Sequence, residues 1–372
     1  MGLPQKNLKQ DVTAHNMNIA FIVPKLVKQG PVVVVYEIVK EMLRRGHSCT
    51  VYYFDSVEKY KDNVQEMPCP TICIGLKDAL PWQDIDVINA HCWRAMFYVY
   101  LHLQQVHRNG IRYVATIHEN MYLSTGSNHG KLYTWLFTHW YVYLLKRADL
   151  RVALSKTVIR DAYEEVFNGY PLTYIYNSRT VRYNESITEE EKETLVKFKG
   201  GDVLLGLNAR LDKVKAVDVI IEALPILEGY KLFVVGDGKE KETLQRLARD
   251  RGVSDRVFFA GYKNDAFRYN PYYDIFMMPS RSEGFPLGLT EAMAYKCNCV
   301  ISDIPIFKEF FTEKEMSFSR LNDPQDLARA VREATKHPKG EAAYEKYCSC
   351  YSPMILGDMY EKVFQGIDNP HE

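Results

Sequence analysis

The sequence has no excess of charge of either sign. Its 372 residues include 47 Lys and Arg and 47 Asp and Glu, so the formal net charge is zero. A protein that binds nucleic acid over a broad surface neutralises many phosphates and needs a basic excess for it. We therefore expect no nucleic-acid partner, and any anion has to be bound by a few local cations.

The eight cysteines do not form a pattern that is typical of disulfides or metal sites. No CxxC pair occurs, and the closest spacings, Cys297/Cys299 and Cys348/Cys350, have no histidine nearby. A structural zinc site needs four ligands, usually cysteines and histidines. Because the cysteines lie in or near apolar segments, we expect reduced, buried thiols in a cytoplasmic protein, and no metal.

No apolar run reaches the roughly 18 residues that are needed to cross a bilayer. The nearest run, 132–145, is interrupted by Thr134, Thr138 and His139. Residues 1–16 are polar and lack the apolar stretch of a signal peptide, so we expect a disordered leader or tag. The expected location is the cytoplasm, at most with a peripheral position at the inner face of the membrane.

The segment 131–147 is rich in aromatic residues and is flanked by Lys131, Lys146 and Arg147. Two interpretations stay open. The segment is either a helix in the core of the first domain or an interfacial helix that contacts a membrane near a lipid-linked acceptor.

From Met17 onward, short β-branched runs alternate with longer stretches of helical periodicity. This alternation is typical of parallel sheets with crossover helices, and the chain length favours two domains. A polar, glutamate-rich stretch that ends in Gly200-Gly201 interrupts the alternation. The sequence thus predicts an α/β fold with two doubly wound, Rossmann-like domains.

The predicted domain ranges are 17–178 for the first domain, 179–201 for a linker, 202–350 for the second domain, and 351–372 for a C-terminal helix that packs across the domains. The predicted strands are 18–23, 48–54, 71–74, 86–89, 112–117, 150–153, 173–176, 202–208, 231–235, 257–260, 275–278 and 298–302.

In such sheets ligands bind at the C-terminal ends of the strands. The loop after strand 202–208 carries Arg210 and Lys215, two cations that match a diphosphate, although a solvated basic loop has the same pattern. After strand 231–235, Gly236 and Gly238 bracket an acid. These glycines either let the backbone approach a ligand or serve a tight turn.

The segment 283–291 joins a predicted strand to a predicted helix. Gly284 permits a turn and Pro286 suits the first helical turn, so the backbone from Phe285 through Leu287 to Gly288 is expected to face an anion. Glu291 would accept hydrogen bonds from ribose hydroxyls, and Glu283 would reach the sugar. Two carboxylates beside a phosphate favour a hydroxyl-rich ligand, while a helix-dipole role for Glu291 is the structural alternative.

Polar residues also follow strands of the first half. Gly30 comes after strand 18–23, Asn89 and His91 after the fourth strand, and His118 after the fifth. His118 is expected to face the cleft between the domains, although a lone histidine is often structural.

The run Glu283-Gly-Phe-Pro-Leu-Gly-Leu-Thr-Glu291 resembles the two-glutamate motif of the retaining glycosyltransferase family four. The similarity extends from Met17 to about Gln365. It also includes Arg210, Lys215, Gly236-Asp-Gly238, Ala148-Asp149, Ser155, Asn177 and Arg44-Arg-Gly46-His47. Two positions depart from the family pattern: Ala216 stands where glycine is usual, and Gln29-Gly30 stand where two glycines are common.

This resemblance implies a GT-B fold, in which two Rossmann-like domains face a cleft and a C-terminal helix crosses back. It implies a retaining transfer of a hexose-type sugar from a nucleoside diphosphate sugar, most often a UDP sugar, to a glycan or lipid-linked acceptor. The family suggests a role in cell-surface polysaccharide or glycoconjugate synthesis. A non-catalytic partner subunit of a transferase and a nucleotide-sugar epimerase are the alternatives.

The same resemblance implies roles for individual residues. Arg210 and Lys215 would neutralise the leaving diphosphate, so no metal and no cofactor is expected. Glu283 and, from the opposite domain, His118 would contact the sugar. The remaining residues expected to bind the donor are Gly30, Gly236, Gly238, Tyr262, Gly284, Phe285, Pro286, Leu287, Gly288 and Glu291.

Overall fold

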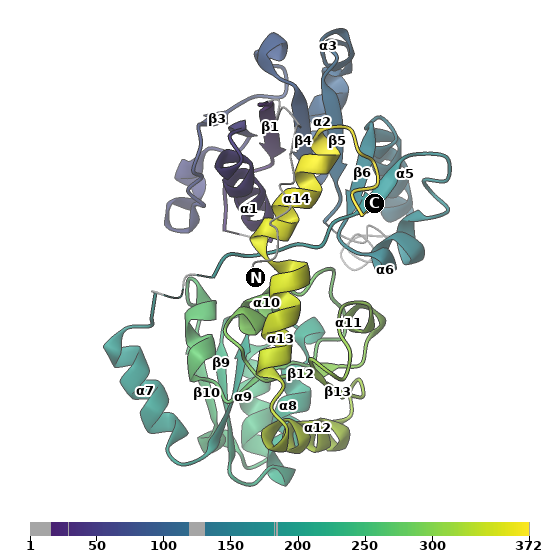
Figure 1. Cartoon of the computed structure of the whole chain (residues 1–372). Helices are drawn as coiled ribbons and strands as arrows, with labels where there is room; N and C mark the ends of the chain where they lie inside the picture. The colour runs from purple at the N-terminus through teal and green to yellow at the C-terminus, as the bar shows by residue number, and fades with distance from the viewer. Residues whose placement is uncertain (1–15, 29, 119–130, 182, 184, 372) are drawn as a thin grey trace, which may run out of the picture.

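The structure is a computed structural model that describes residues 16–28, 30–118, 131–181, 183 and 185–371 (Figure 1). Within these ranges the side chains of residues 61, 62, 131 and 133 are not described. The expected leader, apart from Asn16, and Gln29 of the first loop lie outside the described residues. Two parallel sheets, one in the upper and one in the lower half of Figure 1, organise the molecule.

The first sheet has seven parallel strands in the order β3-β2-β1-β4-β5-β6-β7. The chain builds outward from β1 to β3, returns to β4 on the other side of β1, and continues to β7. The loops after β1 and β4 therefore lie at a topological switch point, where open α/β sheets bind ligands. The strands are β1 (Asn18–Val23), β2 (Ser48–Tyr53), β3 (Thr71–Cys73), β4 (Val87–His91), β5 (Arg112–Thr116), β6 (Leu150–Ala153) and β7 (Leu172–Tyr174).

Helices join these strands. The first of them buries Val34, Val35 and Ile38 against the sheet and ends before Gly46, whose positive φ of +89° suits glycine at a helix end. The helices are α1 (Gly30–Arg44), α2 (Cys92–Leu101), α3 (Leu103–Arg108), α5 (Lys131–Leu145) and α6 (Lys156–Val158).

The second sheet has six parallel strands in the order β10-β9-β8-β11-β12-β13, with a switch point between β8 and β11. Its strands are β8 (Val203–Asn208), β9 (Tyr230–Val235), β10 (Val257–Gly261), β11 (Ile275–Met278), β12 (Cys299–Ser302) and β13 (Ser317–Ser319). The prediction of two Rossmann-like parallel sheets is confirmed. The helices of this half are α7 (Glu189–Lys199), α8 (Val217–Ala223), α9 (Lys241–Asp250), α10 (Leu287–Ala294), α11 (Pro305–Phe310), α12 (Pro324–Lys336) and α13 (Gly340–Lys346).

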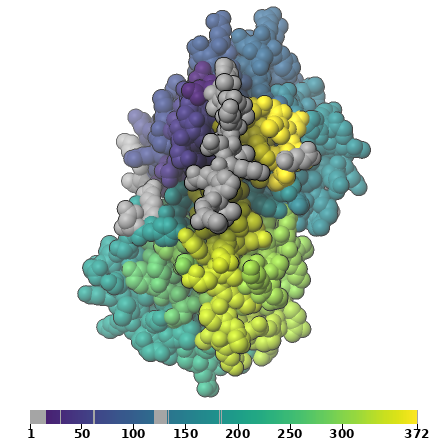
Figure 2. Space-filling model, viewed as in Figure 1, coloured from purple at the N-terminus to yellow at the C-terminus, as the bar shows by residue number. Residues whose placement is uncertain are grey.

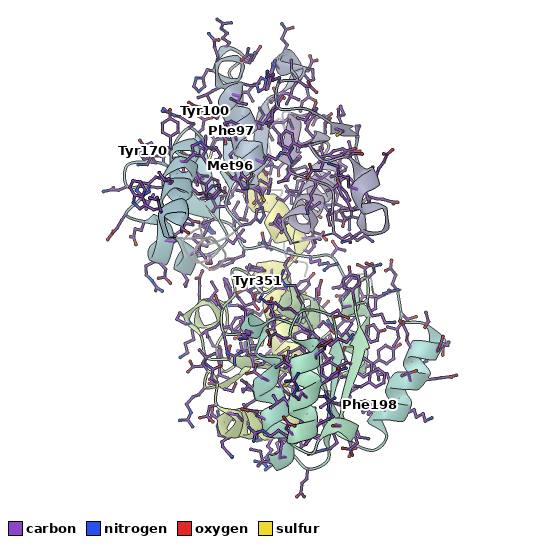
Figure 3. The ribbon with its side chains drawn as sticks, turned by 180° about the vertical axis from the view of Figure 1, so that it is seen from behind. Met96, Phe97, Tyr100, Tyr170, Phe198 and Tyr351 are labelled. Carbon is purple, nitrogen blue, oxygen red and sulfur yellow. The ribbon has the colours of Figure 1, made fainter. Side chains whose placement is uncertain are left out.

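The ends of two helices in the second half follow from the sequence. Helix α8 stops at Ala223, because Pro225 lacks an N–H and the chain tightens into a 3₁₀ turn there. The glutamate-rich stretch contains α7, which begins with a reciprocal cap between Thr188 and Glu191. Phe198 of α7 lies 5.4 Å from Phe258, ring to ring, and so packs on the second sheet (Figure 3).

The C-terminal helix α14 (Pro353–Phe364) returns to the first domain. Figure 1 shows α13 and α14 following one another from the lower domain to the upper one, and Figure 2 shows this segment at the surface of both. Tyr360, Val363 and Phe364 are buried in the core that contains β1, and Glu361 bonds Arg45 at 2.7 Å. The sequence of the second half thus completes the core of the first.

An aromatic cluster connects the two domains. Tyr176 follows β7, Phe285 and Phe310 belong to the second domain, and Tyr351 precedes α14. The ring of Tyr176 lies 5.0 Å from Phe310, and Phe285 lies 6.1 Å from Tyr351. Figure 3 shows Tyr351 between the two halves. Phe285, Phe310 and Tyr351 are buried and Tyr176 is partly buried against them, so the four rings hold the halves together by apolar contact.

Helix α5 has two different faces. Tyr141, Leu144 and Leu145 are buried, whereas Trp135 and Leu136 are 57% and 54% exposed. One face of α5 is therefore part of the core, as the first interpretation expects, whereas the outer face is apolar and exposed. Near it, Tyr100 and Tyr170 lie toward the outside of the domain and Met96 toward its interior (Figure 3). No helix within the described residues is long and apolar enough to span a membrane.

The eight cysteines differ in their exposure, and not all are buried. Cys49, Cys297 and Cys299 are buried, and burial raises the pKa of Cys297 to about 12. Cys73 and Cys348 are exposed, so the expectation of buried thiols is wrong for these two.

Candidate functional site

A cavity of about 740 Å³ opens between the C-terminal ends of the strands of both sheets. The residues that line it and that the sequence pattern singles out are Gly30, Arg210, Gly236, Tyr262, Leu287, Gly288 and Glu291. A neighbouring cavity of about 220 Å³ is lined by Lys215, Glu283, Phe285 and Pro286, and it shares Arg210 and Gly288 with the first. The two sheets thus bring most of the predicted site residues to one place.

The loop after β8 presents the two predicted cations in different ways. Arg210 is 80% exposed, and its Nε donates to Asp212 at 2.9 Å. Asp212 also accepts from the amide of Val214 and so starts the short turn that carries Lys215. The loop ends at Ala216, whose φ of +52° is left-handed. An L-residue costs about 1–2 kcal/mol in that conformation, which explains why glycine suits this position.

The glycine turn after β9 fits tightly against the loop after β8. A Cβ on Gly236 would overlap the carbonyl oxygen of Ala209, and one on Gly238 would overlap that of Leu211. The φ of Gly236 is +151°, a value that also favours glycine. These glycines therefore allow two loops of the site to pack, and only Gly236 lines the large cavity.

The segment between β11 and α10 supplies fewer free amides than the sequence suggests. Pro286 has no N–H, and the N–H of Leu287 donates to the carbonyl of Phe285 at 3.0 Å. Of the predicted residues 285–288, only Phe285 and Gly288 therefore have an amide left for a ligand. Gly284 faces the other domain, because a Cβ on it would lie 3.5 Å from the carbonyl oxygen of His118.

Both glutamates of the motif are ion-paired. Lys215 Nζ lies 2.7 Å from Glu283 Oε1. Glu291 is buried on α10 and pairs with Arg179, which the sequence pattern did not indicate. Burial raises the pKa of the Glu291 carboxyl, and the neighbouring guanidinium of Arg179 opposes this shift. The paired charges explain how carboxylates are retained in a partly buried site.

His118 ends a buried chain of hydrogen bonds. Asn89 Nδ2 donates to the carbonyl of Val114, so its Oδ1 faces His91 Nε2 at 2.7 Å and accepts a hydrogen bond there. His91 Nδ1 then accepts from His118 Nε2, also at 2.7 Å. This order leaves Nδ1 of a neutral His118 as an acceptor. The side chain does not line either cavity, although the backbone of His118 lies beside Gly284.

Several polar residues of the site were not predicted. Arg179, Lys28 and Asp265 line the large cavity, and Asn208 lines both cavities. The sequence signal that could have indicated Arg179 is its position two residues after Asn177, in the connection that follows β7. Among the described residues, no group of three or more His, Cys, Asp or Glu is placed to hold a metal ion.

Comparison with known families assigns both halves of the chain. The family model described as "Glycosyltransferase Family 4" matches residues 29–178, and the model described as "Glycosyl transferases group 1" matches residues 188–348. The chain therefore consists of a glycosyltransferase family 4 domain followed by a glycosyl transferases group 1 domain. The first match covers β2 to β7 and the second covers β8 to β13, so the predicted family and the prediction of a transferase enzyme are confirmed.

Curated relatives of this glycosyltransferase cover most of its length. The O-antigen biosynthesis glycosyltransferase WclY of Escherichia coli is 28% identical over 334 residues, which cover 86% of this chain and 90% of WclY. The N-acetyl-alpha-D-glucosaminyl L-malate synthase of Bacillus anthracis is 24% identical over 367 residues, with 91% and 94% covered.

Solved structures confirm the GT-B fold of the transferase. HepE of Anabaena, determined with UDP and glucose, has a TM-score of 0.72 at 16% identity and covers 94% of this chain and 100% of HepE. The sucrose-phosphate synthase of Thermosynechococcus elongatus has a TM-score of 0.74 at 16% identity, with the same coverage.

The histidine chain predicts a pH dependence of stability. Burial lowers the pKa of His118 from 6.5 to about 4. Between these values the unfolded state binds more protons, so stability falls as the pH drops. We expect the free energy of unfolding, measured in urea, to decrease from about pH 7 to about pH 4.5, and to decrease less in His118→Gln. His107→Gln, which removes a surface histidine, is the matched control, and equal slopes in His118→Gln and the wild type would contradict the prediction.

Proposed function

We propose that this glycosyltransferase moves a hexose-type sugar from a nucleoside diphosphate sugar, with UDP as the nucleotide, to a glycan or lipid-linked acceptor. The observation that carries the proposal is the interdomain cavity, where Arg210 and Glu291 lie beside the smaller cavity of Lys215 and Glu283. The names of WclY and HepE support a role in O-antigen-like cell-surface polysaccharide synthesis and a UDP sugar donor.

The two cations of the β8 loop would bind the diphosphate. Arg210 is largely exposed and free to turn toward a ligand, whereas Lys215 would exchange part of its contact with Glu283 for a phosphate oxygen. Cations placed where charge develops on the leaving group stabilise the transition state. The proposed reaction therefore needs no metal.

The hydroxyl groups of the donor sugar and of the ribose would donate hydrogen bonds to acceptors of the protein. Glu283 would bind the sugar and Glu291 the ribose, while the free acceptor of neutral His118 suits a sugar hydroxyl from the opposite domain. Gly30 and Tyr262, which line opposite sides of the large cavity, would bound the donor there. Since these residues come from both halves, closure of the domains would complete the site.

A screen of nucleotide sugars tests the donor site. We expect Lys215→Ala and Glu291→Ala to weaken the binding of one UDP sugar by about 2–5 kcal/mol, because each removes one partner of a partly buried charged contact. Isothermal titration of the wild type and the variants measures the loss. Lys213→Ala is the matched control, since Lys213 lies exposed on the same loop. Wild-type affinity in both variants would mean that the motif is structural here.

The same screen of nucleotide sugars distinguishes the transferase from two alternative functions. A nucleotide-sugar epimerase would convert the donor without any acceptor and release UDP. A non-catalytic partner subunit would neither bind nor turn over the donor. The presence of Arg210, Lys215, Glu283 and Glu291 together favours the transferase.

We propose that the reaction retains the anomeric configuration by attack on the front face of the sugar. Glu283 is paired with Lys215 and Glu291 with Arg179, so neither carboxylate is presented as a free nucleophile. NMR of the product is expected to show the same anomer as the donor. An inverted product from that donor would exclude this mechanism.

The outer face of α5 supports a peripheral contact with a membrane, on the cytoplasmic side, near a lipid-linked acceptor. Leu132, Trp135 and Leu136 are exposed on this face, and Lys146 and Arg147 follow its end. Exposed aromatic and aliphatic side chains next to cations suit an anionic lipid surface.

Co-sedimentation with vesicles tests this contact. The wild type is expected to bind vesicles that contain anionic lipid, and the double variant Trp135→Ser, Leu136→Ser to bind them several-fold less, because less apolar surface enters the interface. Val196→Ser, an exposed apolar position on α7, is the control. Absence of wild-type binding to anionic vesicles would remove the membrane from the proposal.

A further inference from the structure

Arg179 reaches from the interdomain connection into the large cavity. Its guanidinium is ion-paired with Glu291, and its Nη2 lies 3.2 Å from Asp265 Oδ1. The guanidinium carbon also lies 5.2 Å from the centre of the Phe267 ring. One side chain of the connection is therefore bound to three residues of the second domain.

The backbone around Arg179 is held from the first domain and from the C-terminal segment. The amide and the hydroxyl of Thr180 donate to the buried carboxylate of Glu37 on α1, at 2.8 and 2.6 Å. Tyr347 donates to the carbonyl of Arg179 at 3.1 Å. Because both sides of Arg179 are fixed, its guanidinium is directed toward α10.

Arg179 lies among several acidic side chains. Asp265 and Glu37 both face Glu291 and raise its pKa beyond the effect of burial, and Arg179 is the group that lowers it. Tyr295, at the end of α10, also interacts with Glu291, and Lys28, Arg210 and Lys263 line the same cavity. Without Arg179, buried Glu291 would lose its opposite charge and would take up a proton more readily.

We propose that Arg179 is a positioning residue for donor binding: it holds Glu291 as an oriented carboxylate that accepts hydrogen bonds from the ribose hydroxyls. This inference rests on the proposed function of Glu291. An ionised carboxylate accepts with both oxygens, whereas a protonated one gives up part of that capacity. Arg179 also balances Glu291 and Asp265 in a cavity that has to admit a diphosphate.

The test is the affinity for UDP at pH 6 and pH 8 in the wild type, Arg179→Met and Arg179→Lys. We expect Arg179→Met to bind UDP at least tenfold more weakly at pH 7. Its affinity relative to the wild type should fall further from pH 8 to pH 6, as Glu291 protonates. The ratio to the wild type cancels the titration of UDP itself. Arg179→Lys should recover part of the affinity and should remove the added pH dependence.

Two controls separate this role from a structural one. In a Glu291→Gln background, where position 291 cannot titrate, Arg179→Met should add little loss and no pH dependence. Lys263→Met removes another cation of the same cavity, one that pairs with Glu191, and should add no pH dependence. Thermal melting checks that Arg179→Met is folded, and Arg179→Lys keeps the test usable where it is not.

The outcomes are distinct. Equal UDP affinity and equal pH dependence in wild type and Arg179→Met overturn the inference while the proposed function stands. Tighter binding by Arg179→Met overturns it in another way, because Arg179 would then block the ribose site. Failure of the wild type to bind any nucleotide overturns the proposed function and, with it, this inference.

Discussion

The apolar contact among Tyr176, Phe285, Phe310 and Tyr351 is the constraint on which the site depends. Each Rossmann-like sheet places its loops at one edge, but a cleft forms only when the two edges face each other. The aromatic cluster fixes that arrangement by burying rings from both halves. Beside it, the hydroxyl of Tyr176 donates to Glu309 of α11 at 2.9 Å, so a polar contact accompanies the apolar one.

Within the cleft, charges are paired in advance of any ligand. Lys215 pairs with Glu283, and Arg210 with Asp212, while the interdomain connection supplies the cation for Glu291. A buried charge without a partner is costly, so the largely buried carboxylates of Glu283 and Glu291 need an internal partner when no donor is bound. A phosphate or a hydroxyl group of the donor would then replace or share these ion pairs, instead of binding to charges without a partner. This exchange links the stability of the site to its proposed binding of a nucleotide sugar.

The C-terminal helix makes the first domain part of the same unit. Tyr360 of α14 lies in the core beside β1, and its hydroxyl is 3.4 Å from Thr116 Oγ1. Thr116 in turn accepts from Asn89, at the start of the chain that orders His91 and His118. Helix α14 is therefore connected, through a series of hydrogen bonds, to His118, whose carbonyl lies beside Gly284 of the second domain.

The sequence by itself determined the alternation of strands and helices, the two-domain division of the family, and the loops that carry Arg210, Lys215, Glu283 and Glu291. These features are local: periodicity of burial, glycine at tight turns and a motif within nine residues can be read along the chain. Only the tertiary structure decided which charges meet. Arg179 and Glu291 belong to different segments, and His91 is 27 residues from His118, so no local pattern indicates either contact. The aromatic cluster was hidden for the same reason, because its rings come from segments that are far apart in the sequence and meet only in the folded core.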